Sequence, residues 1–294
     1  MNTSLITTSS GVKEYYYKSG KGKTIVLLSG MGGSLYEWNE IIDSEFSFLA
    51  YNRAGYGNSE PICDYTVATP HEELHSLLQA LHIEEAVLAG FSYGGLIAQG
   101  FAMNYPEKVA GIILIDSTST HMHRLDEVDL SDETFNDDYW IRMCSNLSTL
   151  TPAEIRRERK PQLHPNQKEW NVDVQQALLD HDTNPLLYAS VGKELKVWGE
   201  YAKSLHHLPF PKVPLVVLAR DQKHSLREQL DAGANQQETE ELEKVWNELI
   251  QDQRDLVPDS HFYVAEGSGH HIPLNRPDLI HHSCEMILQH YRAF

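Results

Sequence analysis

The sequence predicts an α/β fold with a mostly parallel central sheet, flanked by helices and interrupted by a helical insertion. Short apolar runs alternate with helical patterns on both sides of one long stretch, residues 121–207, where the alternation stops. One apolar run also passes directly into a helical pattern through a turn of the form G-x-S-x-G, from Gly90 to Gly94. Strands that alternate with helices in this way indicate a parallel sheet with right-handed crossovers.

The expected elements can be placed in chain order from their hydrophobic patterns. A hairpin strand at the sheet edge is expected over 10–18, and the aliphatic run Thr24–Leu28 is typical of a strand buried on both faces. Further strands are expected at 46–51, 85–89, 109–115, 213–219 and 261–265, and helices at 35–43, 67–81, 96–103, 236–253 and 278–291. Ligands of such sheets bind at the carboxyl ends of the strands. We therefore expect the functional site at that edge of the sheet.

Residues 121–207 are polar and helix-like, with several prolines that break the pattern. This stretch is predicted to be a helical cap over the strand ends, inserted into a core formed by residues 1–120 and 208–294. It carries three of the five tryptophans, and of these Trp140 and Trp198 are candidates to line an apolar substrate pocket. The alternative is that these rings form the small core of the cap itself.

Charge and composition narrow the classes of partner. The chain of 294 residues has 24 Lys and Arg against 42 Asp and Glu, a formal charge of −18. Nucleic acid and anionic membranes both require a basic face, so neither is expected as a partner. A small-molecule substrate is expected instead. The first residues lack the pattern of a secretory signal, and the three scattered cysteines are typical of reduced thiols. These features favour a cytoplasmic protein, while the oligomeric state stays open.

Sixteen histidines raise the question of a metal. They occur mainly as adjacent pairs and as His121-x-His123, without H-E-x-x-H or a partnering C-x-x-C pair. The sequence therefore predicts no metal, and it contains no other cofactor motif.

Ser92 is the candidate nucleophile, because it stands at the centre of the G-x-S-x-G turn. A serine at such a turn sits on strained backbone that lifts its hydroxyl clear of the sheet. The Tyr93 N–H begins the following helix, where it can donate to a developing oxyanion. The alternative is a glycine-rich strand-to-helix connection that holds an incidental serine.

Four motifs together give the chain a resemblance to a known family. They are Leu28–Gly33, Asn52–Ser59, Gly90–Gly95 and Gly267–Pro273. In this order and at these distances, the chain resembles the α/β-hydrolase fold family, and within it the capped, esterase- or lipase-like branch that uses a serine nucleophile. Two positions depart from the family pattern, since Ser29 stands where histidine is usual and Asn52 where aspartate is usual.

The resemblance implies a catalytic triad in the chain order serine, acid, histidine. Ser92 would be the nucleophile and His270 the general base, with His271 the weaker candidate, and the Met31 and Tyr93 N–H groups would form the oxyanion hole. The acid is open between two aspartates. Asp221 follows the strand after the insertion, where most members carry the acid, but its spacing is unusual. Asp116, which follows the strand after the Ser92 helix, is favoured.

The function implied is hydrolysis of small, largely apolar esters or related acyl compounds through an acyl-enzyme. A second hypothesis is a ligand-sensing or signalling module of the same fold that turns over slowly or not at all. Steady turnover would favour the hydrolase, and single-turnover trapping of a ligand would favour the sensing module.

Overall fold

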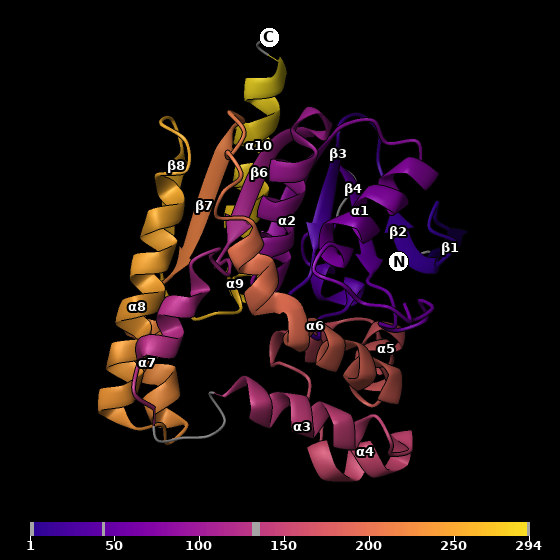
Figure 1. Ribbon diagram of the computed structural model, residues 1–294, viewed down its shortest axis with the longest axis vertical. Helices are drawn as coiled ribbons and strands as arrows, with labels where there is room; N and C mark the ends of the chain where they lie inside the picture. Colours follow the sequence, from indigo (N-terminus) through magenta and orange to yellow (C-terminus); the bar gives the residue numbers. More distant parts are fainter. Residues whose placement is uncertain (1–2, 43–44, 131–135, 293–294) are drawn as a thin grey trace.

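Eight strands form a single sheet in the computed structural model, which describes residues 3–42, 45–130 and 136–292 (Figure 1). The strands are β1 (Ser4–Thr7), β2 (Lys13–Lys18), β3 (Thr24–Leu28), β4 (Ser47–Asn52), β5 (Ala86–Phe91), β6 (Val109–Ile115), β7 (Leu215–Arg220) and β8 (His261–Ala265). Their order is β1-β2-β4-β3-β5-β6-β7-β8. The pairs β1–β2 and β2–β4 are antiparallel and all others are parallel, which confirms the predicted sheet type.

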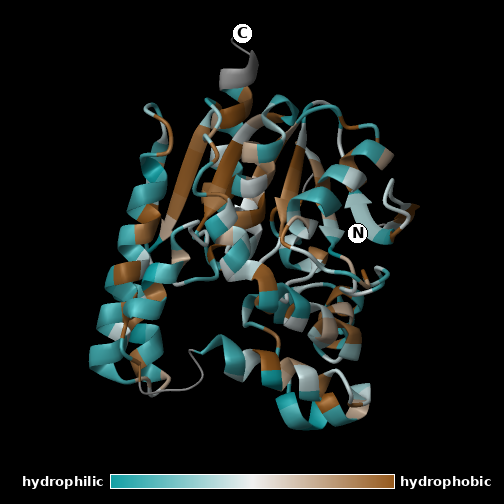
Figure 2. Cartoon of the chain, in the orientation of Figure 1, coloured by the Kyte–Doolittle hydropathy of each residue, from teal (hydrophilic) through white to brown (hydrophobic). Residues whose placement is uncertain are grey.

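Helices cover both faces of this sheet. Outside the insertion they are α1 (Thr69–Ala80), α2 (Tyr93–Asn104), α7 (Gln222–Asp231), α8 (Gln236–Arg254), α9 (Ile272–Asn275) and α10 (Pro277–Arg292), with 3-10 turns η1 (Leu35–Trp38) and η2 (Pro106–Lys108). Because side chains alternate along a strand, Val26 and Leu28 face α1, α2 and α8, whereas Ile25 and Leu27 face α10 and η1. Figure 2 shows the resulting apolar strands between helices whose outer surfaces are polar.

Two helical segments differ from the prediction. The helix expected at 35–43 is only the turn η1, in which Leu35 and Trp38 are both buried at the three-residue spacing of a 3-10 turn; Asp43 lies outside the described residues. Helix α7 has too few apolar residues to be recognised from its pattern. It begins where the Asp221 side chain accepts hydrogen bonds from the N–H groups of Lys223 and His224.

Between β6 and β7 the described chain forms only helices and 3-10 turns. They are η3 (Met122–Glu127), α3 (Asp137–Leu147), α4 (Pro152–Arg159), η5 (Asn166–Glu169), α5 (Val172–Asp182) and α6 (Pro185–Ser204). Figure 1 shows α3 and α4 beyond the sheet, at the end toward which the β7 arrow points. In the part of the chain that the structure describes, no helix is long and apolar enough to cross a membrane.

Candidate active site

Ser92 lies at the sharp turn between β5 and α2, with φ 53° and ψ −121°. A residue other than glycine in this region stores about 1–3 kcal/mol of strain, which the surrounding structure must hold. Here the Ser92 N–H donates to Ile115 O (3.0 Å) and Thr118 N–H donates to Ser92 O (3.0 Å), so both peptide groups are fixed to the end of β6. A Cβ on Gly94 would collide with the Leu28 carbonyl group, so the close passage of helix and strand requires glycine there.

The Ser92 side chain is half-buried, and within the described residues its hydroxyl makes no hydrogen bond. Beside it, Tyr93 is the first residue of α2, so its N–H has no acceptor within the helix. Met31 lies in the loop after β3, and a Cβ added to its neighbour Gly30 would stand 3.3 Å from the Ser92 Cβ. The turn and the loop are therefore in direct contact, as the predicted oxyanion hole requires.

The loop after β3 is held in shape by buried side chains from the turn after β4 and from the insertion. Arg53 donates from Nη1 to Ser29 O (2.7 Å) and from Nη2 to Gly30 O (2.9 Å). Tyr56 Oη accepts from the Gly32 N–H (3.0 Å), and the His181 ring lies 2.9 Å from Gly32 O. These contacts fix four successive peptide groups around Met31.

Glu194 of α6 neutralises the charge of Arg53 inside this cluster. Its Oε1 lies 2.8 Å from Arg53 Nε, and its Oε2 accepts from the Tyr56 hydroxyl at 2.6 Å. The side chains of Arg53 and Glu194 are 4% and 2% exposed. The insertion is thus anchored by a buried ion pair to the residues that shape the loop, a feature that sequence reasoning missed because 141 residues separate the two partners.

Removing the negative charge from this pair should be costly. In Glu194→Gln the Arg53 guanidinium stays buried without the carboxylate that is hydrogen-bonded to it, and we expect the free energy of unfolding to fall by about 3–5 kcal/mol. Glu200→Gln, an exposed change on the same helix, should stay within about 0.5 kcal/mol of the wild type. Urea denaturation of the three proteins measures the difference, and equal stability of both variants would contradict this view of the pair.

A second buried carboxyl group lies beside Arg53. Glu73 Oε1 accepts from the Ala54 N–H (2.5 Å), and burial raises the pKa of Glu73 to about 7 despite that bond and the nearby Arg53. The folded state therefore holds a proton that an unfolded chain loses near pH 4.3, so this group lowers stability as the pH rises from about 4.3 to about 7.

Glu73→Gln removes this titration while it keeps an acceptor for Ala54. We expect the unfolding free energy of the variant, relative to that of the wild type, to increase steadily as the pH rises from about 4.3 to about 7. Denaturant unfolding at several pH values tests this, and a difference that does not change with pH would count against it.

His270 and Asp116 come together although 154 residues separate them. Asp116 follows β6 with a positive φ of 39°, and His270 lies in the loop after β8. His270 Nδ1 is 2.5 Å from Asp116 Oδ2, and the His270 ring packs 4.8 Å from the ring of Phe91, the residue before Ser92. The neighbouring His271 is exposed. All of these groups gather at the carboxyl ends of the parallel strands.

Arg220 and Trp246, which sequence reasoning did not single out, complete the surroundings of Asp116. Arg220 Nε donates to Asp116 Oδ2 (2.7 Å) and Trp246 Nε1 donates to Oδ1 (3.0 Å). Burial by itself would raise the pKa of Asp116, but the Arg220 guanidinium and the bond from His270 outweigh it and hold that pKa well below its ordinary value. Asp116 is therefore a carboxylate at every physiological pH.

Asp221, the alternative acid, has different partners. Its side chain caps α7 and also accepts from the Gly267 N–H at 3.1 Å, a bond that lowers the pKa of Asp221. Arg220 and Asp221 are successive residues at the end of an extended strand, so their side chains leave in opposite directions. The one that reaches Asp116 and His270 is Arg220, whose Nη2 lies 3.0 Å from His270 Nδ1.

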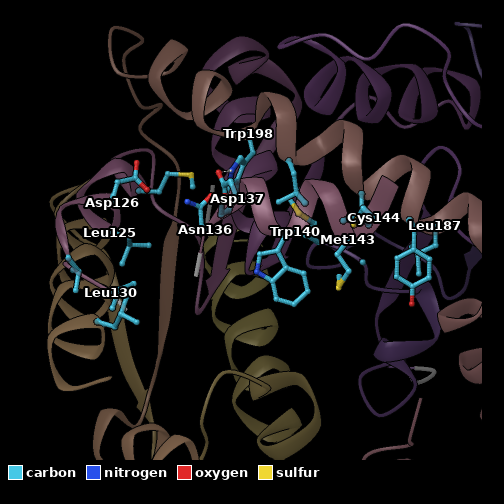
Figure 3. A pocket seen from close by; sticks show the side chains of 18 of the residues that line it. Leu125, Asp126, Leu130, Asn136, Asp137, Trp140, Met143, Cys144, Leu187 and Trp198 are labelled. Carbon is cyan, nitrogen blue, oxygen red and sulfur yellow. Dashed lines mark hydrogen bonds between the residues drawn. The ribbon is translucent and has the colours of Figure 1, made fainter. Parts of the chain in front are cut away.

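A cavity of about 1210 Å³ lies between the sheet edge and the insertion helices (Figure 3). Trp140 and Trp198 both line it, together with an apolar set that includes Leu125, Met143 and Leu187. The cavity reaches the loop after β3 through Met31, which packs against the same buried cluster as Trp198. Ser92 and His270 are not among the residues that line it. The two tryptophans therefore face a space that opens toward the predicted oxyanion loop.

Comparisons with known proteins agree with this fold. Residues 23–140 match the family model described as alpha/beta hydrolase fold. An uncharacterized protein of Mycobacterium tuberculosis is 32% identical over 114 residues, which is 37% of this chain and 33% of that protein. RutD of Escherichia coli, named as a candidate carbamate hydrolase, is 31% identical over 112 residues, or 35% of this chain and 42% of RutD.

Among solved structures, a thermophilic esterase from Thermogutta terrifontis with malate bound superimposes with a TM-score of 0.65 over 99% of both chains, at 22% sequence identity. That likeness concerns the fold, and the sequence matches cover only about a third of the first relatives' own length. The sheet order and these matches define an α/β protein with a sharp strand-to-helix turn at Ser92. The chain has the α/β-hydrolase fold, and its residues 23–140 match the model of that family.

Proposed function

We propose that the protein is a serine hydrolase of small, largely apolar esters or related acyl compounds. Ser92 is the nucleophile, His270 the general base and Asp116 the acid that orients it. The observation that carries the proposal is the 2.5 Å contact between His270 Nδ1 and Asp116 Oδ2, made beside a serine on strained backbone. Asp221 is given a structural role in this proposal, because its carboxylate caps α7.

In this mechanism the Nδ1–H of His270 donates to Asp116, which leaves Nε2 to take the proton from the Ser92 hydroxyl. The hydroxyl oxygen attacks the ester carbonyl, and the N–H groups of Met31 and Tyr93 stabilise the oxyanion. His270 then returns the proton to the leaving alcohol. Water repeats the sequence on the acyl-enzyme and releases the acid. The ion pair of Arg53 and Glu194 takes no part in these steps. Its role is to hold the Met31 loop in the geometry in which the Met31 N–H can donate to the oxyanion.

Substrate selection is assigned to the insertion. We propose that residues 121–207 act as a cap on a core of residues 1–120 and 208–294, and that the cavity beneath α3 and α6 receives the apolar part of the substrate. Asp126, Asp129 and Asp137 also line the cavity. Their charges, with the net −18 of the chain, disfavour anionic substrates and leave neutral esters as the preferred class.

Shortening Trp140 or Trp198 to alanine should shift the preferred acyl length toward longer chains, because each change enlarges the cavity. The ratio of kcat/KM for long and short esters measures the shift. Trp170→Ala is the matched control, since Trp170 is 7% exposed and packs with Leu178 and Leu274 outside this cavity. It should lower stability without a change in preference. If the cavity variants also change only stability, their rings belong to the core of the cap.

Two measurements on the unmodified protein test the function. Steady-state rates on p-nitrophenyl esters from acetate to dodecanoate should show continuous turnover, and a fluorophosphonate should block it. Mass spectrometry should then locate the adduct on the peptide that contains Ser92. An adduct on another serine would overturn the site, whereas an adduct on Ser92 without steady turnover would favour the ligand-sensing module instead.

A further inference from the structure

Three histidines that are distant in sequence gather outside the proposed catalytic site. His121, His123 and His206 each place a ring nitrogen within 4.8 Å of those of the other two. The rings of His121 and His206 lie 4.3 Å apart, and that of His123 is 5.7 Å from His206. The sequence showed only a separate H-x-H and an H-H pair, so the cluster is created by the fold.

The cluster lies where the chain enters and leaves the insertion. His121 and His123 stand at the start of η3, a short loop after the sheet strand β6, and His206 follows the C-cap residue of α6, Leu205, on the return toward β7. A ligand shared by these rings would therefore join the two chain segments that connect the insertion to the sheet. Met122, between the first two histidines, lines the large cavity.

The hydrogen bonds of the rings suit a metal ligand set. His206 Nε2 lies 2.7 Å from Thr120 O, and since a carbonyl can only accept, Nε2 carries the hydrogen and Nδ1 has the free lone pair. Metal-binding histidines commonly donate their second N–H to a backbone carbonyl in this way. His123 Nδ1 is buried and has no hydrogen-bond partner among the described residues.

The charges nearby do not oppose a cation. Arg124, the nearest guanidinium in sequence, is engaged by Glu248 (2.5 Å) and Asp252 (3.1 Å) of α8. Tetrahedral zinc with Zn–N bonds of about 2.1 Å places ligand nitrogens about 3.4 Å apart, so the rings would have to close by at most about 1.4 Å. Imidazole side chains can cover this distance by rotation.

We propose that His121, His123 and His206 bind one divalent transition-metal ion of the zinc type, with water at the fourth position, and that this ion clamps the two connections of the insertion. Three imidazoles suit zinc and its neighbours Co²⁺ and Ni²⁺ and do not suit Mg²⁺ or Ca²⁺, which prefer oxygen ligands. The ion's role here is structural, and the proposal does not depend on the esterase mechanism.

The test is a Zn²⁺ titration of the full chain by competition with a chromophoric chelator, repeated with Co²⁺ to record the visible spectrum of a tetrahedral site. We expect one site per chain and a melting temperature that rises with the metal. His123→Ala and His206→Ala should each weaken binding by at least about tenfold, since even loss of an outer-shell partner typically costs that much. His207→Ala, an exposed change next to the cluster, should leave the affinity unchanged.

His121→Ala is the control for misfolding, because His121 is exposed. Its loss should weaken metal binding without lowering the stability of the metal-free protein. His270→Ala should keep the site, which separates it from any metal bound by the proposed catalytic histidine. Absence of a Zn²⁺ site, or a site of unchanged affinity in the three cluster variants, would overturn the proposal and leave the rings as a packing contact.

Discussion

Replacing Ser92 with alanine should lower kcat for ester hydrolysis by about 10⁶-fold, the loss that follows when the serine of a cooperating triad is removed. The reason is that His270 and the oxyanion donors then have no nucleophile to activate, and only their binding of the substrate remains. Initial rates on the best ester of the panel, measured at saturating substrate, give this number. KM should change little, because the Ser92 hydroxyl contributes little to binding of the ground state.

Ser145→Ala is the matched control, since Ser145 is an exposed serine on α3 far from the turn in sequence. Its kcat should equal that of the wild type. Alanine keeps the Cβ that makes this φ strained, so the Ser92 variant should have about the same stability as the wild type. Activity retained in Ser92→Ala would contradict the proposed nucleophile.

The second large effect is expected at Asp116. Asp116→Asn should lower kcat by about 10⁴-fold, because the amide no longer holds the Nδ1–H tautomer of His270 or balances its positive charge. Asp221→Asn should cost little in activity and only modestly in stability, since the amide oxygen can still cap α7 but the amide nitrogen cannot accept from the Gly267 N–H. The pair of variants therefore compares two aspartates under the same chemical change.

Asp116 also carries the charge that faces Arg220, whose Nη2 lies 2.6 Å from Asp116 Oδ2. Arg220 keeps a second carboxylate, Glu243, at 2.9 Å from Nη1, so Asp116→Asn should still fold while its stability falls. Circular dichroism at the assay temperature separates a catalytic loss from unfolding. A large loss of kcat in Asp221→Asn with a small one in Asp116→Asn would transfer the role of the acid to Asp221.

Much of the fold could be predicted from local sequence. Thr24–Leu28, Val109–Ile115 and His261–Ala265 are strands with the expected bounds, because each is a short apolar run between clear breaks. The Ser92 turn was equally readable from its G-x-S-x-G spacing, although only Gly90 is imposed by backbone close in sequence, while Gly94 is imposed by the Leu28 carbonyl group of β3. Helix α7 was missed because its stability comes from a cap at Asp221 and not from an apolar stripe.

The sequence by itself thus determined the sheet type, the serine turn and the histidine loop, all of which depend on residues close together along the chain. Only the tertiary structure decided which aspartate lies against His270, because strand order brings the ends of β6 and β8 together across 154 residues. The same holds for Arg53 with Glu194 and for the cluster of His121, His123 and His206. A buried charge or an imidazole carries no periodic signal in the sequence, and its partner is chosen by the packing of distant segments.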